Sequence, residues 1–161
     1  MGGLGDKYVI LIHDVSSAQR LIDFAKLVYG LGFKILVASK VYGAAASSGI
    51  PEVMRLAIRK GKIFTVLSEA KEAVELFEPE KVVVVSREYG EPIEPNDLAS
   101  KLGDYRKTLI IFGGIDPAPG KDVVGLGEAV YPIATESRLG PVAEAALLLY
   151  PLSRGSTQET S

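Results

Sequence analysis

Short apolar runs and amphipathic stretches alternate along the whole chain. The first run, YVILIH at residues 8–13, is apolar at every position up to its closing histidine. An uninterrupted apolar run of this length is typical of a parallel strand that is covered on both faces. On this criterion we predict six strands, at residues 8–13, 33–38, 63–66, 81–85, 108–112 and 129–133.

Capping residues and prolines between these runs predict five helices. Ser16 or Ser17 caps the first helix, Pro51 lies in the first turn of the second, and Asn96 or Asp97 caps the fourth. We expect loops between several of these elements, including the small-residue segment at 41–49 and the Pro- and Gly-rich segment at 88–95. The predicted helices span residues 17–29, 51–60, 68–77, 97–102 and 141–150.

The alternation of strands and helices predicts an α/β fold with one mostly parallel sheet and helices on both of its faces. Residues 1–152 are expected to form a single domain, and the polar residues 153–161 a flexible tail. Ligands of such open sheets bind beyond the carboxyl ends of the strands. The expected site therefore consists of four residue pairs that follow strands: His13–Asp14, Ser86–Arg87, Gly113–Gly114 and Ile133–Ala134.

Composition narrows the classes of function. The net charge of -2 lacks the overall basic excess that is usual in nucleic-acid-binding proteins. The densest basic cluster, within residues 55–62, lies at an expected helix end, where cations are favoured in any case. No apolar run approaches the roughly 20 residues of a membrane span, and no signal peptide is evident. We therefore expect a cytoplasmic protein without membrane contact.

The chain has no cysteine and a single histidine, His13. Disulfides, thiolate zinc sites and a cysteine nucleophile are therefore excluded, and we expect no metal site. The absence of cysteine and the scarcity of Asn and Gln, together with abundant Val, Lys and Glu, are typical of proteins from thermophiles.

Glycines end the fifth predicted strand. At Gly113 and Gly114, the absence of a side chain would let a ligand approach the backbone closely or would allow a positive φ, but a simple tight turn explains the pair equally well. The later Gly125-Leu126-Gly127 lacks both the spacing and the Lys-Ser/Thr of a phosphate-binding loop, so we reject that motif.

Several polar residues near the strand ends allow more than one interpretation. Arg87 contacts substrate or is an ordinary surface arginine; Asp14 is a base, a ribose ligand or only a helix N-cap. Arg138 orients an RNA phosphate or pairs with Glu136. His13, at the end of an apolar run, is interpreted as a structural histidine with a hydrogen-bond partner.

From residue 108 onward the chain resembles the SPOUT class of RNA methyltransferases. The resemblance rests on FGG at 112–114, on Pro132 in a later strand, on Ser137 with Leu139, and on the helix AEAALLLY at 143–150. It implies a C-terminal trefoil knot, S-adenosyl-L-methionine as the cofactor, tRNA or rRNA as the substrate, and a homodimer. It places catalysis or substrate contact at Arg87, Asp14 and Arg138. It places the cofactor at Phe112, Gly113, Gly114, Pro132, Ile133, Ala134, Ser137 and Leu139.

The chain departs from that class at two positions. Gly140-Pro141 stands where the class has an Asn after its Ser-Leu pair, and Ile115 precedes Asp116 where an acidic residue is usual after the glycine. A binding-only member is therefore one alternative, and a non-catalytic α/β module that binds a ligand or a protein is another. A nuclease would need grouped carboxylates for magnesium, with Asp14, Asp116 and Glu128 as candidates.

Overall fold

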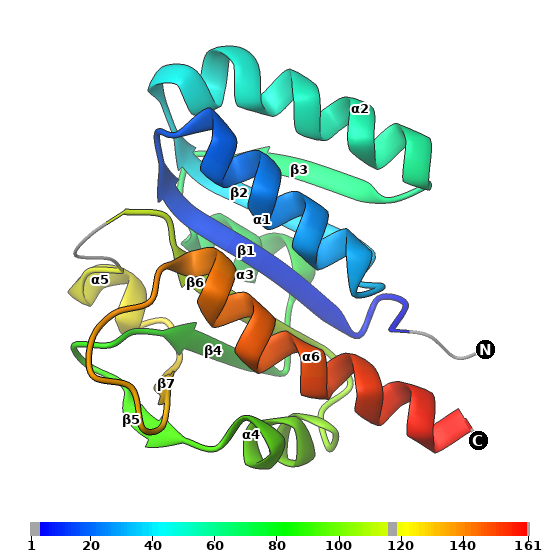
Figure 1. The fold of residues 1–161 in the computed structure, drawn as a ribbon, viewed down its shortest axis with the longest axis vertical. Coiled ribbons are helices and arrows are strands. Elements are labelled where there is room, and N and C mark those ends of the chain that lie inside the picture. Colours follow the sequence, from blue (N-terminus) through cyan, green and yellow to red (C-terminus); the bar gives the residue numbers. More distant parts are fainter. Residues whose placement is uncertain (1–3, 116–118, 161) are drawn as a thin grey trace.

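The fold is a seven-stranded, wholly parallel sheet between two layers of helices, seen in a computed structural model that describes residues 4–115 and 119–160, the last five of these by backbone alone (Figure 1). The strand order is β3-β2-β1-β6-β4-β7-β5. The predicted α/β class, with helices on both faces, is confirmed. The strands are β1 (Tyr8–Val15), β2 (Ile35–Val41), β3 (Ile63–Leu67), β4 (Lys81–Val85), β5 (Glu91–Ile93), β6 (Thr108–Gly113) and β7 (Glu128–Pro132).

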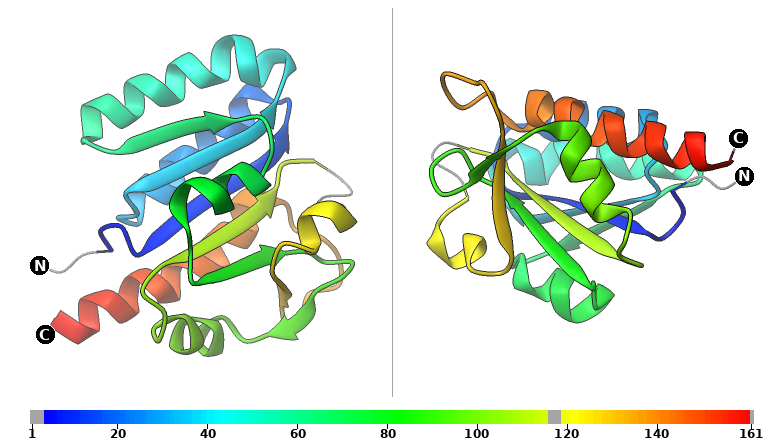
Figure 2. Two further views of the ribbon diagram at one scale, coloured as in Figure 1. Left: turned by 180° about the vertical axis from the view of Figure 1, so that it is seen from behind. Right: turned by 90° about the horizontal axis from the view of Figure 1, so that it is seen from below.

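Each face of the sheet has its own apolar core. One core packs under α1 (Ala18–Gly30), α2 (Ile50–Lys60), α4 (Pro95–Leu102) and α6 (Pro141–Thr160). The other packs under the shorter α3 (Lys71–Phe77) and α5 (Lys121–Val124), on the opposite side of the sheet (Figure 2). Because β1 and β6 are central, alternate residues of each strand enter opposite cores, which explains why both read as unbroken apolar runs.

Local signals fixed the first two helices as expected. Ser17 is the N-cap of α1, and its hydroxyl accepts a hydrogen bond from the Arg20 amide at 3.1 Å. Pro51 lies in the first turn of α2, and Gly61 ends that helix in the left-handed conformation at φ 65°.

The segment at 41–49 is not a loop, contrary to the prediction. It contains a π-helical turn, η1 (Ala45–Gly49), which continues directly into α2 and packs on α1. Its small residues explain this close packing, since a Cβ added at Gly49 would lie 3.3 Å from the Ala18 Cα. Alanine and serine do not mark a particular turn or helix, so the prediction of a loop at 41–49 rested on composition alone.

The predicted loop at 88–95 is also wrong in part, because it contains the edge strand β5. This strand pairs only with β7, and the Ile133 amide donates to the Ile93 carbonyl at 3.0 Å. Pro92 is tolerated because an edge strand has one unpaired side. The three-residue strand is too short to show a period in the sequence.

Three helix boundaries differ from the prediction. Helix α3 begins at Lys71 rather than Ser68, since the Glu72 carboxylate accepts the Ser68 and Glu69 amides outside the helix. Helix α4 has Glu94 as its N-cap, with Pro95 rather than Asn96 or Asp97 opening the first turn.

Helix α6 passes its predicted end at Tyr150 and continues to Thr160. Pro151 lies inside it, and Leu152 anchors the extension in the core. The segment from residue 153 is therefore helical up to Thr160, while its flexibility and the trefoil knot stay predictions. Among the described residues, no helix combines the length and apolarity needed to cross a bilayer.

Candidate functional site

The carboxyl ends of four adjacent strands bring the predicted site residues to one edge of the sheet. Strands β1, β6, β4 and β7 are successive neighbours and all run in the same direction. Asp14, Gly113, Arg87 and Ile133, at or just past the ends of these strands, therefore lie along a single edge (Figure 1). We call this the carboxyl edge.

Gly113 ends β6 and Gly114 follows it, and the protein's own packing requires Gly114 to lack a side chain. Neither belongs to the glycines with positive φ, which removes that interpretation. A Cβ added at Gly114 would lie 2.4 Å from the Asp14 carbonyl oxygen and 2.8 Å from the Val15 Cβ. The tip of β6 thus lies directly against the end of β1, and Gly114 donates its amide to the His13 carbonyl at 2.8 Å.

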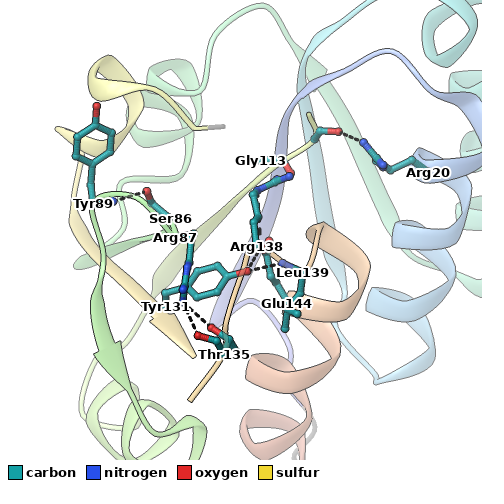
Figure 3. A network of polar contacts seen from close by, with 11 residues as sticks. Arg20, Ser86, Arg87, Tyr89, Gly113, Tyr131, Thr135, Arg138, Leu139 and Glu144 are labelled. Carbon is teal, nitrogen blue, oxygen red and sulfur yellow. Dashed lines mark hydrogen bonds and ion pairs between the residues drawn. The ribbon is translucent and has the colours of Figure 1, made fainter. Parts of the chain in front are cut away.

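Three arginines from different elements bind main-chain carbonyls along the carboxyl edge (Figure 3). Arg20 of α1 donates to the Gly114 carbonyl at 2.7 Å, and Arg138 donates to the Gly113 carbonyl at 2.8 Å. Arg87 donates to the carbonyl and hydroxyl oxygens of Thr135 at 2.9 and 2.8 Å. A guanidinium has five N–H donors, so the bonds of Arg20 and Arg87 to these oxygens use only part of that capacity.

Arg87 also joins two loops to each other. Its guanidinium carbon lies 5.7 Å from the centre of the Tyr131 ring, and its bonds to Thr135 reach the loop after β7. Arg87 is exposed and makes these contacts at the surface, and its contact with substrate stays a prediction. No sequence motif marks the bond of Arg20 to Gly114.

Behind the arginines, Tyr131 of β7 and Glu144 of α6 form a buried polar network (Figure 3). The Tyr131 hydroxyl donates to Glu144 Oε2 at 2.5 Å and accepts the Leu139 amide at 2.8 Å. The Arg138 Nε lies 3.9 Å from the same carboxylate oxygen. Burial, together with the hydrogen bond to Glu144, raises the pKa of Tyr131 to about 12.

Sequence reasoning missed this network. Glu144 is only 1% exposed although it is charged, and it lies in a helix that reads as apolar. The one available signal was that single acidic residue within AEAALLLY. Arg138, which we expected to orient a phosphate or pair with Glu136, bridges Gly113 and Glu144, and both expected roles stay predictions.

Asp14 lies at a strained point of the edge. It has φ 69°, and its neighbour across the sheet, Lys40, has φ 51°. The Asp14 carboxylate accepts the Tyr42 hydroxyl at 2.9 Å and lies 3.5 Å from the Lys40 ammonium. Ser17 caps α1, so the N-cap interpretation of Asp14 is wrong. Left-handed φ values at non-glycine residues concentrate at functional sites.

His13 is a structural histidine, as interpreted from the sequence. It is 6% exposed, and its Nδ1 lies 2.8 Å from the hydroxyl of the buried Ser39. Burial lowers the pKa of His13 below its ordinary value of 6.5. The imidazole is therefore neutral at physiological pH and belongs to the scaffold of the edge.

The residues expected to hold a cofactor divide into two groups. Phe112 is fully buried and packs edge-to-face on Phe24, so its side chain belongs to the core and not to a ligand-facing wall. Pro132, Gly113 and Gly114 are also buried. The exposed members all lie in the loop between β7 and α6: Ile133, Ala134, Ser137 and Leu139.

That loop borders a groove between α1 and α6. Leu139 and Val142 line one side of the groove, and Ser17, Arg20 and Asp23 line the other. Ile133 is 50% exposed and Leu139 is 42% exposed, which is unusual for large apolar side chains in a folded protein. Ala134, at φ 67°, turns the chain between β7 and this loop. The loop thus offers apolar surface beside the groove.

Two of the carboxylates considered for a nuclease, Asp14 and Glu128, lie at opposite ends of their strands. Within residues 4–115 and 119–160, no three His, Asp or Glu side chains are grouped so as to hold a metal ion. Asp14 is the next-to-last residue of β1, at the carboxyl edge, whereas Glu128 opens β7 at the opposite edge and is held by Lys81 and Lys101. Asp116 lies outside the described residues.

Comparison with sequences gives one family. The model of the family described as RecB-family nuclease (DUF2122) matches residues 43–151. A protein of Aeropyrum pernix, named as a candidate type II restriction enzyme (ApeKORF2002P), is 42% identical over 90% of this chain and 92% of its own length. A similarly named protein of Methanocaldococcus jannaschii (MjaORF1200P) is 27% identical over 92% of this chain and 97% of its own.

Comparison with solved structures gives a different kind of protein. A methylase-family protein of Haemophilus influenzae superposes with a TM-score of 0.75 at 18% identity, over 96% of this chain and 66% of its own. The SpoU methyltransferase AviRb of Streptomyces viridochromogenes, in complex with AdoMet, gives 0.73 at 15%, over 95% and 62%. The TrmH/SpoU tRNA-modifying enzyme of A. aeolicus gives 0.71 at 10%, over 99% and 80%. The chain therefore has the SPOUT methyltransferase fold.

Proposed function

The chain belongs to the family described as RecB-family nuclease (DUF2122), and from its SPOUT fold we propose that it is an S-adenosyl-L-methionine-dependent RNA methyltransferase rather than a nuclease. One observation carries the proposal: nearly the whole chain superposes on AviRb, a methyltransferase whose structure holds AdoMet. The family's description is of a nuclease. Cleavage needs carboxylates grouped around a metal ion, and the described residues include no such group.

The donor set at the carboxyl edge suits this cofactor. Adenine and ribose need apolar walls and main-chain donors and acceptors, and the loop between β7 and α6 supplies both through Ile133, Ala134 and Leu139. No acidic cluster or metal is required for such binding. When bound, S-adenosyl-L-methionine would supply the methyl group as an activated sulfonium.

The chain's own residues would position the acceptor nucleotide and remove its proton. The Arg87 guanidinium binds Thr135 through Nη1, and its other N–H donors suit an RNA phosphate; Arg138 is a second cation at the same edge. Asp14, the next-to-last residue of β1, lies at this edge and would accept the proton of the acceptor oxygen or nitrogen. Most of the rate enhancement would come from orientation of the two reactants.

We also propose that the protein acts as a homodimer. The outer face of α6 exposes Ala143, Leu147 at 43% and Tyr150 at 50%, next to the groove that Leu139 borders. A continuous apolar strip on one helix suits a two-fold contact with the same strip of a second copy. The groove lined by Arg20 would then lie beside the partner subunit.

Binding and cleavage assays separate the proposed function from its alternatives. Titration of metal-free protein with S-adenosylhomocysteine in EDTA should give micromolar binding, one molecule per subunit. A nuclease would instead cleave DNA or RNA only with magnesium and would lose that activity in Asp116→Ala. No binding at millimolar ligand by a folded protein would refute the methyltransferase proposal, and absence of both activities would favour a binding module.

A further inference from the structure

Glu144 is an anomaly that the proposed catalytic roles leave unused. It is a carboxylate with 1% exposure in the first turn of α6, surrounded in sequence by alanines and leucines. A buried charge is costly unless ion pairs and hydrogen bonds compensate it. Such a residue is retained where it specifies one arrangement of the groups around it.

Two contacts of Glu144 lead to the loop before α6. Its Oε2 accepts the Tyr131 hydroxyl, and the same hydroxyl accepts the Leu139 amide. Arg138, 3.9 Å from this oxygen, bonds the Gly113 carbonyl. The positive end of the α6 dipole adds to the stabilisation of the carboxylate.

These contacts join three separate elements around a single loop. Tyr131 belongs to β7, Glu144 to α6, and Gly113 to the tip of β6, while Arg138 and Leu139 lie between β7 and α6. Figure 3 shows Glu144 and the Tyr131 hydroxyl directly behind this loop. The positions of both ends of the loop, and its contact with β6, therefore depend on the Glu144 carboxylate and the Tyr131 hydroxyl.

We infer that Glu144, acting through Tyr131, is a positioning residue that fixes the loop of residues 133–140 in the shape that receives the cofactor. The inference rests on the proposed function. The residues that would contact the cofactor, Ile133 and Leu139, are exposed, and the Leu139 amide is held by the Tyr131 hydroxyl. In the sequence, Gly140-Pro141 lies between Tyr131 and Glu144, and it stands where the class that the chain resembles has an Asn.

Two variants remove the network, and a third preserves it. Tyr131→Phe keeps the ring and deletes the hydroxyl that holds both Leu139 and Glu144. Glu144→Leu removes the carboxylate at similar volume. Glu144→Gln retains an oxygen that can accept the Tyr131 hydroxyl, so it should behave as the conservative rescue.

Matched controls lie at the opposite edge of the sheet. Tyr29 is as buried as Tyr131, and its hydroxyl donates to the Ile63 carbonyl at 2.8 Å. Tyr29→Phe therefore deletes a comparable hydrogen bond far from the loop. Glu128→Gln removes a carboxylate that is bound to Lys81 and Lys101. Neither residue belongs to the proposed binding machinery.

The decisive measurement is the affinity for S-adenosylhomocysteine, by calorimetry, together with amide exchange at Leu139. In Tyr131→Phe we expect about tenfold weaker binding, the size of a loss of one to two hydrogen bonds, and faster exchange at Leu139. Glu144→Leu should do the same, Glu144→Gln should stay within about threefold of the wild type, and both controls should bind normally.

Several outcomes would overturn the inference. Wild-type affinity and unchanged Leu139 exchange in folded Tyr131→Phe would show that the pair does not hold the loop. A merely structural role would lower the melting temperature without changing affinity, as we expect of Tyr29→Phe. If the wild type itself binds no ligand, the proposed function fails, and exchange at Leu139 still decides whether the network orders the loop.

Discussion

Replacement of Gly114 by alanine would force apart the two strands that form the centre of the carboxyl edge. The added Cβ would lie 2.4 Å from the Asp14 carbonyl oxygen and 2.8 Å from the Val15 Cβ. The first contact is about 1 Å short of an ordinary van der Waals distance. Backbone atoms of a paired parallel strand cannot rotate away as a flexible side chain can, so the strand itself must shift.

The cost follows from the size of the clash. Overpacking costs about 1–3 kcal/mol, and a backbone contact belongs near the upper end of that range. Alanine recovers about 0.4–1 kcal/mol by restricting the unfolded chain. A net loss of about 2 kcal/mol lowers the melting temperature of a protein of this size by about 4–8 °C. Movement of the Gly114 carbonyl would also disturb the Arg20 contact.

Thermal unfolding followed by circular dichroism tests this estimate. The matched control is Gly30→Ala, because a Cβ at Gly30 meets no atom within 4 Å and its φ is not left-handed. We expect the control to melt no lower than the wild type. Equal melting temperatures for the two variants would refute the argument that Gly114 is required by the approach of β1 to β6.

Three further predictions concern separate parts of the molecule. Since burial lowers the pKa of His13, the unfolded chain takes up its proton first; the stability due to neutral His13 should be present at pH values well above the unfolded pKa of 6.5 and be lost progressively as the pH falls well below it. The free energy of unfolding, measured with urea at a pH well above and a pH well below 6.5, should depend less on pH in His13→Gln than in the wild type. An equal pH dependence in the two proteins would contradict this. Arg87→Ala should weaken RNA binding or turnover more than S-adenosylhomocysteine binding, because its contacts join loops around Tyr131; an equal loss of all three would indicate a scaffold role. Tyr29→Phe should lower the free energy of unfolding by about 1 kcal/mol because the Ile63 carbonyl loses a donor, and an unchanged value would count against that bond.

The fold was predictable where a local signal and burial agreed. β1 and β6 are covered on both faces and read as unbroken apolar runs, and Ser17 and Pro51 mark helix starts by their own chemistry. The π-helical turn at 45–49 and the edge strand β5 were missed because tertiary contacts, rather than local preference, form them. Small residues, and a strand that is paired on one side only, give no clear hydrophobic period in a sequence.

The position of the site could be predicted from the sequence, but the contacts between its residues could not. The parallel order of the strands is enough to bring Asp14, Arg87 and Gly113 to one edge. The bonds of Arg20 to Gly114 and of Tyr131 to Glu144 join residues whose neighbourhood only the folded chain creates. Phe112 shows the opposite error, since an aromatic residue beside a glycine turn suggested a ligand wall and packs in the core.

The position of β1 in the sheet has a consequence for synthesis on the ribosome. β1 pairs with β2 soon after it is made, but its other side waits for β6, and Tyr8 pairs with Thr108. At about 5–20 residues per second, the intervening chain takes about 5–20 s to translate. During that time the nascent chain presents an apolar strand with one open edge, which is the geometry that templates aggregation. We expect the yield of folded protein to depend on how fast the chain is elongated.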